Sequence, residues 1–386
     1  MQGCCVALEL AARGVNVDLF ERTAMPMQAT SRMNEGKIHL GYVYAKDVRL
    51  ATARLMVRGA LCFDAFLRRH LNTTACAPRS TPFVYGVHRQ SQMGARDIAA
   101  HFAAVDRLIV DATASGVTGD YLGETFLPSS RPLPVELHFD PTCIEAAFET
   151  PERAVDVRVL ADAIMARVLA DPRITFHGGH DVERAERVGE RFRLACAGGW
   201  ITGFRHVVNT SWASRLAIDS AFGLVPPRPW LYRYKFGLHV RQRPPAFAIP
   251  SVTLILGPFG DVVDYGEGAY YFSWYPTCRI AVSTALVPPA VDDLPPTPDG
   301  KACIEPLREI VPALDGIDIG RASTQIVGGW IFAWAKTDID DALSELHRRD
   351  EVGVYSVSGY HTINTGKLTL APLHALTVCN HIVPLN

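Results

Sequence analysis

The chain has 386 residues, of which 48% are hydrophobic, and this length allows a large core shared by two intertwined domains. Its 38 Lys and Arg residues nearly balance 40 Asp and Glu residues, so no charge excess favours binding to nucleic acid or to an anionic membrane. No apolar run approaches the roughly 18 residues of a membrane span, no secretion signal opens the chain, and nine scattered cysteines form no disulfide framework, so we expect a cytoplasmic globular protein.

The first residues carry half of a dinucleotide-binding fingerprint. Gly3 leads into an apolar helix pattern at 4–12, then come Gly14, a strand pattern at 15–20 and Glu21. In a complete βαβ unit, a strand and two further glycines precede this glycine, and an acidic residue about 20 positions on binds the ribose hydroxyls. Glu21 has that spacing, whereas the preceding strand is absent from the sequence. We therefore expect an N-terminally truncated Rossmann-like domain, with a plain amphipathic helix and strand as the alternative.

The next segments alternate between a loop, a helix and a second set of strands. A polar loop at 31–42 contains glycines, an amide and an imidazole, which suits a segment that lies against a ligand, although ordinary surface loops share this composition. Asp47 begins a long amphipathic helix that ends before Asn72. From 81 to 139, short alternating runs at 83–87 and 135–139 flank a helix near 95–105, a pattern that indicates an inserted domain.

The remaining segments return to the first domain and then leave it again. A helix starts at Asp156 and stops at Asp171, before strands at 174–176, 191–195 and 204–208. A broad antiparallel sheet is predicted from the segments 231–240, 252–256, 269–274 and 280–285. A helix at 303–311 follows, and the segment 353–381 is a strand, a glycine-containing loop and a helix.

This order predicts an α/β protein with two discontinuous domains. One is a Rossmann-like cofactor-binding domain that lacks its first strand, formed by 1–75, 151–224 and 335–386. The other is an inserted α+β substrate domain on a mixed or antiparallel sheet, formed by 76–150 and 225–334. His177 and His180 flank two glycines without a Cys or carboxylate cluster beside them, so no metal site is expected.

Four blocks resemble the flavin-dependent oxidoreductases of the D-amino acid oxidase superfamily: 3–21, 31–42, 207–210 and 366–372. The first is similar to the family's dinucleotide fingerprint, and the last to the glycine turn and helix start that cover the flavin ring. The second is similar to the loop of the 2-hydroxyglutarate dehydrogenase branch, through the spacing of Asn34, Gly36, Ile38, His39 and Gly41. The resemblance runs from Gly3 to the C-terminus.

The resemblance implies FAD as cofactor and a set of residues around it. The amides of Gly3 and its neighbours would face the pyrophosphate, and those of 366–369 the pyrimidine edge of the ring, because both ends carry negative charge. His39 and Tyr271 are the catalytic candidates, and His39 could accept a substrate proton or hydrogen-bond the ring. The cofactor-binding candidates are Gly3, Glu21, Arg22, Arg32, Asn34, Gly36, Lys37, Val182, Asn209, Thr210, Gly366, Lys367, Leu368 and Thr369.

The implied reaction is removal of hydride from a carbon that bears a hydroxyl or amino group, in a small molecule that carries a carboxylate. Arg233 or Lys235 could hold that carboxylate. The electron acceptor is left open between oxygen and a quinone. Two alternatives are a non-catalytic or cofactor-deficient relative, suggested by the absent first strand, and a nicotinamide-dependent dehydrogenase, in which the 366–369 block has no role.

Overall fold

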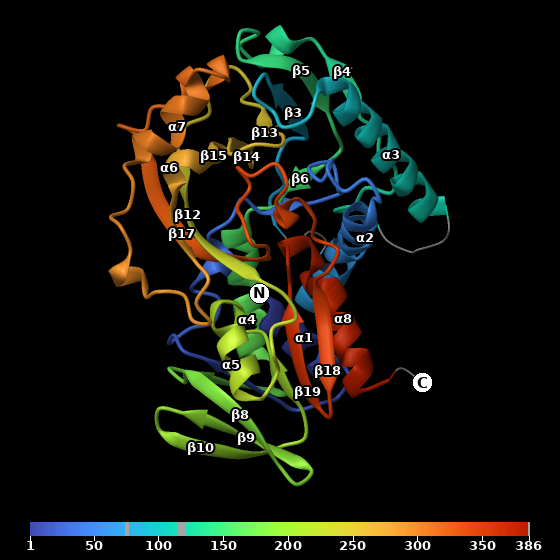
Figure 1. Cartoon of the computed structure of the whole chain (residues 1–386), viewed down its shortest axis with the longest axis vertical. Helices are drawn as coiled ribbons and strands as arrows, with labels where there is room; N and C mark the ends of the chain where they lie inside the picture. The colour runs from blue at the N-terminus through green and yellow to red at the C-terminus, as the bar shows by residue number, and fades with distance from the viewer. Residues whose placement is uncertain (74–76, 115–119, 385–386) are drawn as a thin grey trace.

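The computed structural model describes residues 1–73, 77–114 and 120–384, and it is a mixed α/β fold (Figure 1). The predicted domain boundary between 75 and 76 lies outside the described residues. The helices are α1 (Gln2–Ala12), α2 (Ala51–Leu71), α3 (Ala95–Ala114), α4 (Val157–Ala170), α5 (Arg215–Ala221), α6 (Tyr275–Cys278), α7 (Gly300–Arg308) and α8 (Ala371–Ile382). None of those eight has both the length and the apolar character of a membrane-crossing helix.

The strands fall into one large sheet and several small ones. The large sheet contains β3 (Phe83–His88), β4 (Arg131–Leu133), β5 (Ile144–Glu149), β12 (Trp230–Arg241), β13 (Ser251–Leu254), β14 (Gly260–Asp264), β15 (Ala269–Trp274), β16 (Arg279–Ser283) and β17 (Ser323–Trp334). The small sheets contain β1 (Val17–Glu21), β2 (Lys37–Ile38), β6 (Arg153–Ala154), β7 (Ile174–Gly178), β8 (Val182–Val188), β9 (Arg191–Cys196), β10 (Gly199–Phe204), β11 (Val207–Asn209), β18 (Gly353–Val357) and β19 (Tyr360–Asn364).

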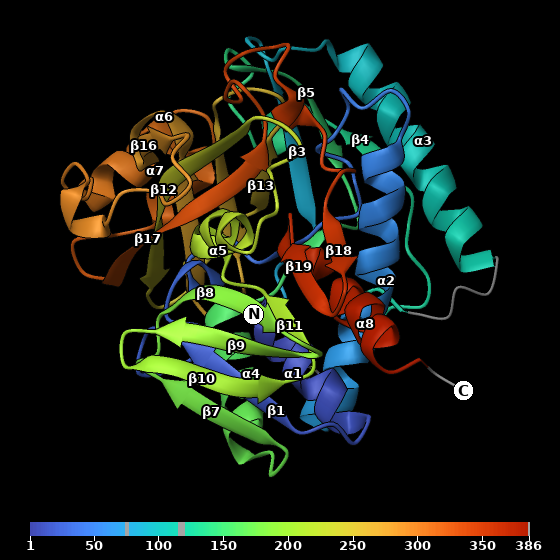
Figure 2. The same cartoon turned by 60° about the horizontal axis from the view of Figure 1, so that its bottom comes forward.

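The parallel strands form two separate sheets rather than one. Strand β1 runs parallel to β7, and β11 runs parallel to β19, to which β18 is antiparallel. Figure 2 shows these two groups together with the β8–β9–β10 meander. Within the described part of the chain, one edge of β1 and one edge of β11 have no strand partner. The start of α1 lies between them, because a Cβ on Gly3 would approach both the Leu19 side chain and Thr210 Oγ1.

The large sheet lies at the opposite end of the molecule from the meander (Figure 1). Its strand order is β16-β12-β15-β14-β13-β3-β5-β4, with β17 also paired to β12 along twelve residues. The sheet is mixed, because β13 runs parallel to β3 while the other pairs are antiparallel. All nine strands lie within 76–150 and 225–334, although the division into two domains remains a prediction.

Three elements differ from the expectation. The run 135–139 is not a strand, because the fixed backbone of Pro134 starts a 3-10 turn at Val135–Leu137. Helix α3 extends to Ala114, since Ile109 continues its buried face. The single strand expected near 353 is a hairpin, in which Ser358 and Gly359 have φ of 49° and 86°, the conformation that two-residue hairpin turns require.

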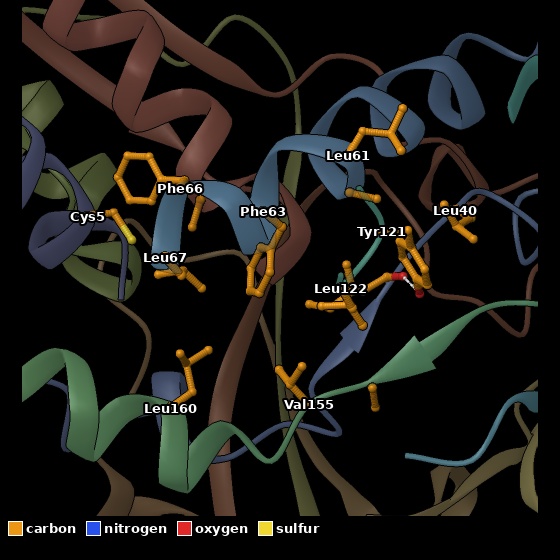
Figure 3. Close-up of a cluster of buried hydrophobic side chains, with 14 of the residues drawn as sticks. Cys5, Leu40, Leu61, Phe63, Phe66, Leu67, Tyr121, Leu122, Val155 and Leu160 are labelled. Atoms are coloured by element: carbon orange, nitrogen blue, oxygen red, sulfur yellow. Dashed lines mark hydrogen bonds between the residues drawn. The ribbon is translucent and has the colours of Figure 1, made fainter. Parts of the chain in front are cut away.

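A shared hydrophobic core joins α1, which lines the cavity, to α2 and α4 behind it. Figure 3 shows Phe63, Phe66 and Leu67 of α2 near Cys5 of α1 and Leu160 of α4, and all of them are buried. In the same core the Tyr121 hydroxyl donates a hydrogen bond to the Ile38 carbonyl at 2.7 Å. Buried apolar area of this extent stabilises the fold at about 25 cal/mol per Å². The loop at 31–42 therefore rests on a rigid base.

Helix α4 offers a test of the predicted cap. The Asp156 side chain accepts hydrogen bonds from the backbone N–H groups of Arg158 and Val159, as expected at the start of a helix. Replacing Asp156 by Ala should lower the free energy of unfolding by about 1 kcal/mol, because both N–H groups lose their acceptor. Urea unfolding followed by circular dichroism measures this change. The variant Asp156→Ser keeps an acceptor, so an equal loss in both variants would contradict the assignment.

Candidate functional site

A cavity of about 1330 Å³ lies between the parallel strands and the large sheet. Its walls come from α1, β1, the loop at 31–44, β11, β12, β14 and the segment 365–368. Most small-molecule pockets have volumes of about 300–1000 Å³, so this cavity has room for a cofactor and a substrate together. The unpaired edges of β1 and β11 both face it, because residues 15–22 and 203–214 line its wall.

One end of the cavity has the features of a dinucleotide site. Gly3 lines it at the start of α1, where unpaired N–H groups and the helix dipole favour a negative charge. A Cβ on Gly3 would lie 2.7 Å from Thr210 Oγ1, so this position needs a glycine. Glu21 and Arg22 at the end of β1, and Val182 at the start of β8, line the same end.

Asn209 and Thr210 also line this end, at the carboxyl end of β11. The Asn209 amide nitrogen donates to the Arg215 carbonyl, to Asp219 Oδ1 and to the Tyr360 hydroxyl at 2.8–3.1 Å. Its oxygen accepts hydrogen bonds from Ser211. Because the side chain is occupied in this way, Asn209 fixes the shape of the turn and leaves the backbone to face a ligand.

The middle of the cavity joins the two loops that resemble flavin-contacting segments. Asn34, Lys37 and His39 line it from one side, and Gly366, Lys367 and Leu368 from the other. The two loops are joined because the His39 N–H donates to Thr369 Oγ1 at 2.8 Å. Gly36 has φ of +70° and a Cβ there would meet the Val155 carbonyl, so this glycine shapes the loop from behind.

Four predicted residues do not form part of the cavity wall: Arg32, Gly36, Tyr271 and Thr369. Arg32 pairs with Asp162 on α4 instead. Tyr271 is 2% exposed and its ring packs over Gly237 and beside His239, within the large sheet. Alternation along β15 places this side chain on one face of the sheet, where the missing side chain of Gly237 on β12 leaves room for the ring. An aromatic residue in a strand therefore does not by itself indicate a pocket.

Buried charges of both signs line one wall. Lys37 Nζ hydrogen-bonds to Thr253 and lies 3.3 Å from Asp261 Oδ1, and Lys235, Lys367 and Glu35 line the same wall. Burial alone would raise the pKa of Asp261, but Lys37 and Lys235 lower it to about 2. Burial lowers the pKa of the Lys367 ammonium to about 8, although the Glu35 charge opposes this shift.

Sequence reasoning missed Arg349, a buried cation of the cavity wall. Its side chain is 7% exposed, it lines the cavity, and no carboxylate of the described residues lies within salt-bridge distance of it. Burial lowers its pKa to about 10, and the charge of Arg233 adds to this effect. Arg233 is already paired with Asp338, so it is less available than Arg349 to bind the carboxylate of a substrate. The sequence around Arg349 has no periodicity or motif that could have indicated this role.

His39 is the buried imidazole of the site. It is 3% exposed, and neither ring nitrogen has a hydrogen-bond partner in the described structure. Its Nδ1 lies 3.7 Å from Glu152 Oε1, and its ring centroid lies 5.8 Å from that of Tyr44. Burial and the Lys367 charge lower the pKa of His39 despite Glu152. The imidazole is therefore neutral at neutral pH and can accept a proton.

Comparison with known proteins agrees with this geometry. Residues 1–380 match the family described as FAD dependent oxidoreductase. No curated protein sequence matches the chain. Among solved structures, glycine oxidase from Geobacillus kaustophilus has a TM-score of 0.69 at 15% identity, and the match covers 98% of this chain and 90% of that one.

Two further structures have the same fold. Iminodiacetate oxidase from Chelativorans sp. BNC1 has a TM-score of 0.68 at 15% identity, with 100% of this chain and 94% of that chain covered. L-proline dehydrogenase from P. horikoshii has a TM-score of 0.65 at 15% identity, with 98% and 90% covered. The family match decides for FAD over a nicotinamide cofactor and gives no support to a non-catalytic relative. The chain therefore belongs to the family of FAD dependent oxidoreductases.

Proposed function

We propose that the protein removes hydride from a carbon bearing a hydroxyl or amino group in a small carboxylate-containing molecule. The observation that carries this proposal is that one cavity is lined both by the Arg349 guanidinium, which has no carboxylate partner among the described residues, and by the neutral imidazole of His39. A guanidinium binds a carboxylate through two parallel hydrogen bonds, and a neutral imidazole accepts a proton. FAD, when bound, supplies the two-electron acceptor.

The residues present fit the cofactor. Gly3 and the N–H groups at the start of α1 would hold the pyrophosphate, and Glu21 the ribose hydroxyls. Gly366, with φ of +67°, and Lys367 would line the ring side of the cavity, and their own backbone N–H groups donate to Asn364 Oδ1 and to the Thr365 carbonyl. Arg22, Asn34, Lys37, Val182, Asn209, Thr210 and Leu368 complete the lining on the cofactor side.

The substrate then occupies the part of the cavity between Arg349 and His39. Arg349 orients the substrate through its carboxylate, and His39 accepts the proton of the hydroxyl or amino group. Tyr44 lines this part of the wall, and its hydroxyl has no hydrogen-bond partner in the described structure. Arg233, Tyr275 and Asp338 form a hydrogen-bonded wall beside Arg349. Hydride loss and proton loss together leave a carbonyl or an imine.

Anaerobic mixing of the FAD-loaded protein with a panel of 2-hydroxy acids and 2-amino acids tests this proposal. At least one class should bleach the flavin absorbance near the visible maximum, whereas the matching alcohols and amines without a carboxylate should not. Admitting oxygen, or adding a soluble quinone, then identifies the acceptor by which one restores the colour. A protein that binds FAD and is bleached by no member of the panel would overturn the proposal.

Gly3 provides a test of the cofactor end. The variant Gly3→Val should lower the FAD content of the purified protein by about tenfold or more, because its Cβ would lie 2.7 Å from Thr210 Oγ1 and displace the start of α1. The ratio of flavin to protein absorbance measures the content. The matched control is Gly94→Ala, since a Cβ on Gly94 meets nothing within 4 Å. Equal FAD content in both variants would place the pyrophosphate elsewhere.

The lowered pKa of Lys367 leads us to expect that anion binding depends on pH. Its ammonium has a pKa of about 8, so it is charged below that pH and neutral above it. The affinity for a 2-oxo acid should therefore be highest below pH 8 and fall, by at most about tenfold for each further pH unit, as the charge is lost. Perturbation of the flavin spectrum measures the affinity. In Lys367→Met this decline should disappear, and a decline of unchanged size would assign it to another group.

A further inference from the structure

We propose that Glu152 is a positioning residue that holds His39 in its reactive orientation and stabilises the imidazolium that forms when His39 accepts a proton. This inference rests on the proposed function of His39. Glu152 lies just before β6, far from His39 in the sequence, and it is fully buried at 0% exposure. A carboxylate buried this completely is costly unless its neighbours compensate its charge, so its contacts carry information.

Each oxygen of Glu152 has its own partner. Oε1 accepts the backbone N–H of Leu40 at 2.6 Å and lies 3.7 Å from His39 Nδ1. Oε2 accepts the hydroxyl hydrogen of Tyr85. The carboxylate therefore holds the loop in place at Leu40, the residue that follows His39. The remaining acceptor capacity of Oε1 faces the imidazole. Burial alone would raise the pKa of Glu152, but His39, Lys37 and Tyr85 bring it below its ordinary value.

The groups around His39 define what Glu152 can do. Besides Glu152, the ionisable side chains that act on the imidazole are Lys37 on β2, Lys367 before α8, Tyr44 in the following loop and Glu35 in the preceding one. The positive charges of the two lysines disfavour protonation of His39, and Lys367 has the larger effect on its pKa. Among the described residues, Glu152 is the carboxylate at ion-pair distance from a ring nitrogen of His39, with 3.7 Å between its Oε1 and Nδ1. Glu152 is therefore the group whose negative charge stabilises protonated His39.

The geometry assigns a separate task to each ring nitrogen. Nδ1 faces Glu152, and Nε2, which is buried without a hydrogen-bond partner in the described structure, is the nitrogen left to meet the substrate. When the C–H bond of the substrate gives up its hydride, for which bound FAD would be the acceptor, the O–H or N–H bond breaks and its proton forms a bond to His39 Nε2, so the electron pair of the O–H or N–H bond completes the carbonyl or imine. The imidazolium then carries its second N–H toward the carboxylate, the arrangement that stabilises such cations in buried sites. Glu152 itself gains and loses no proton.

Three variants test this arrangement through the titration of His39. The imidazole signals of histidine-labelled protein are followed by NMR from pH 4 to 9, and the His39 signal is assigned by its loss in His39→Asn. In Glu152→Gln the pKa of His39 should fall further, because the charge is removed while Oε1 can still accept the Leu40 N–H. In Tyr85→Phe it should rise, because the carboxylate loses a competing donor and interacts more strongly with the imidazole. In Glu152→Asp, which keeps the negative charge, the pKa of His39 should stay close to its value in the parent.

The reaction rate should change together with the pKa of His39. Glu152→Gln should slow anaerobic bleaching by about tenfold or more at pH 7 and shift the pH profile of bleaching, whereas a purely structural role would change stability without moving the profile. The matched control is Glu149→Gln, a half-buried carboxylate of β5 that pairs with Arg131 away from the cavity. It should leave both readouts unchanged.

The outcomes separate this inference from the proposed function. If Glu152→Gln does not fold, Tyr85→Phe decides, and an unchanged His39 titration there overturns the inference. A His39 signal that titrates identically in the parent and in Glu152→Gln does the same. If the titrations shift as expected while no substrate bleaches the flavin, the positioning of His39 stands and the proposed reaction fails.

Discussion

Replacing His39 by Asn is expected to slow flavin bleaching by about 10²- to 10⁴-fold while FAD content stays close to that of the parent. Asn keeps a polar side chain of similar reach but cannot accept a proton, so the substrate proton has no acceptor when hydride leaves. The His39 backbone N–H still donates to Thr369 Oγ1, which preserves the junction between the two loops. Single-turnover mixing under nitrogen measures the rate.

The control for this variant is another buried histidine. His374 on α8 is 4% exposed and its Nε2 also has no hydrogen-bond partner in the described structure, but it does not line the cavity. His374→Asn should therefore change the melting temperature and leave the bleaching rate near that of the parent. A similar loss of rate in both variants would show that the effect comes from packing rather than from proton transfer.

The second large effect is expected at Arg349. Replacing it by Met should weaken binding of a carboxylate substrate or 2-oxo acid by about 10- to 150-fold, which corresponds to the loss of charge-assisted hydrogen bonds worth about 1.5–3 kcal/mol. Met preserves the volume of the buried stem, so the cavity wall remains. The Kd from spectral titration, and the KM where turnover is measurable, report the change.

The neighbouring residue supplies a matched control. Arg348 is half-exposed and pairs with Asp350 and Glu351 on the surface, so Arg348→Met removes the same charge from the same segment without touching the cavity wall. Its effect on binding should stay within about twofold, because exposed ion pairs contribute little. Weakening of similar size in both variants would assign the effect to the overall potential of the protein instead of to a carboxylate contact at Arg349.

Local patterns predicted the elements that are stabilised locally. The helix at 4–12 and the strand at 15–20 follow from periodicity, and Asp156 caps α4 as its position indicates. Asp47 does accept the Thr52 N–H of α2, although that helix starts only at Ala51. The resemblance then indicated the loops that meet at the cavity, because glycines with positive φ leave a recognisable spacing.

Long-range contacts could not be predicted in the same way. Glu152 and His39 are brought together by packing between distant segments, and nothing near either residue indicates the other. Arg349 lies in a polar segment whose charges resemble those of any surface loop. Tyr271 was predicted from its place in a strand, but alternation along a strand does not tell whether a buried ring packs against other side chains or lines a pocket, and Tyr271 lies outside the cavity wall. Such residues are identified by burial and partners, which only the fold determines.

The two ends of the chain interlock beside the cavity, and this has a consequence for biosynthesis. The Gln2 amide donates to the Ala371 carbonyl and Arg13 donates to the Val383 carbonyl, so α1 is completed by α8. During translation, the first helix must wait until nearly all other residues have left the ribosomal tunnel before it gains this partner. We therefore expect FAD to bind only after α8 has been made, and a nascent chain halted before α8 should lack bound FAD and depend on chaperones.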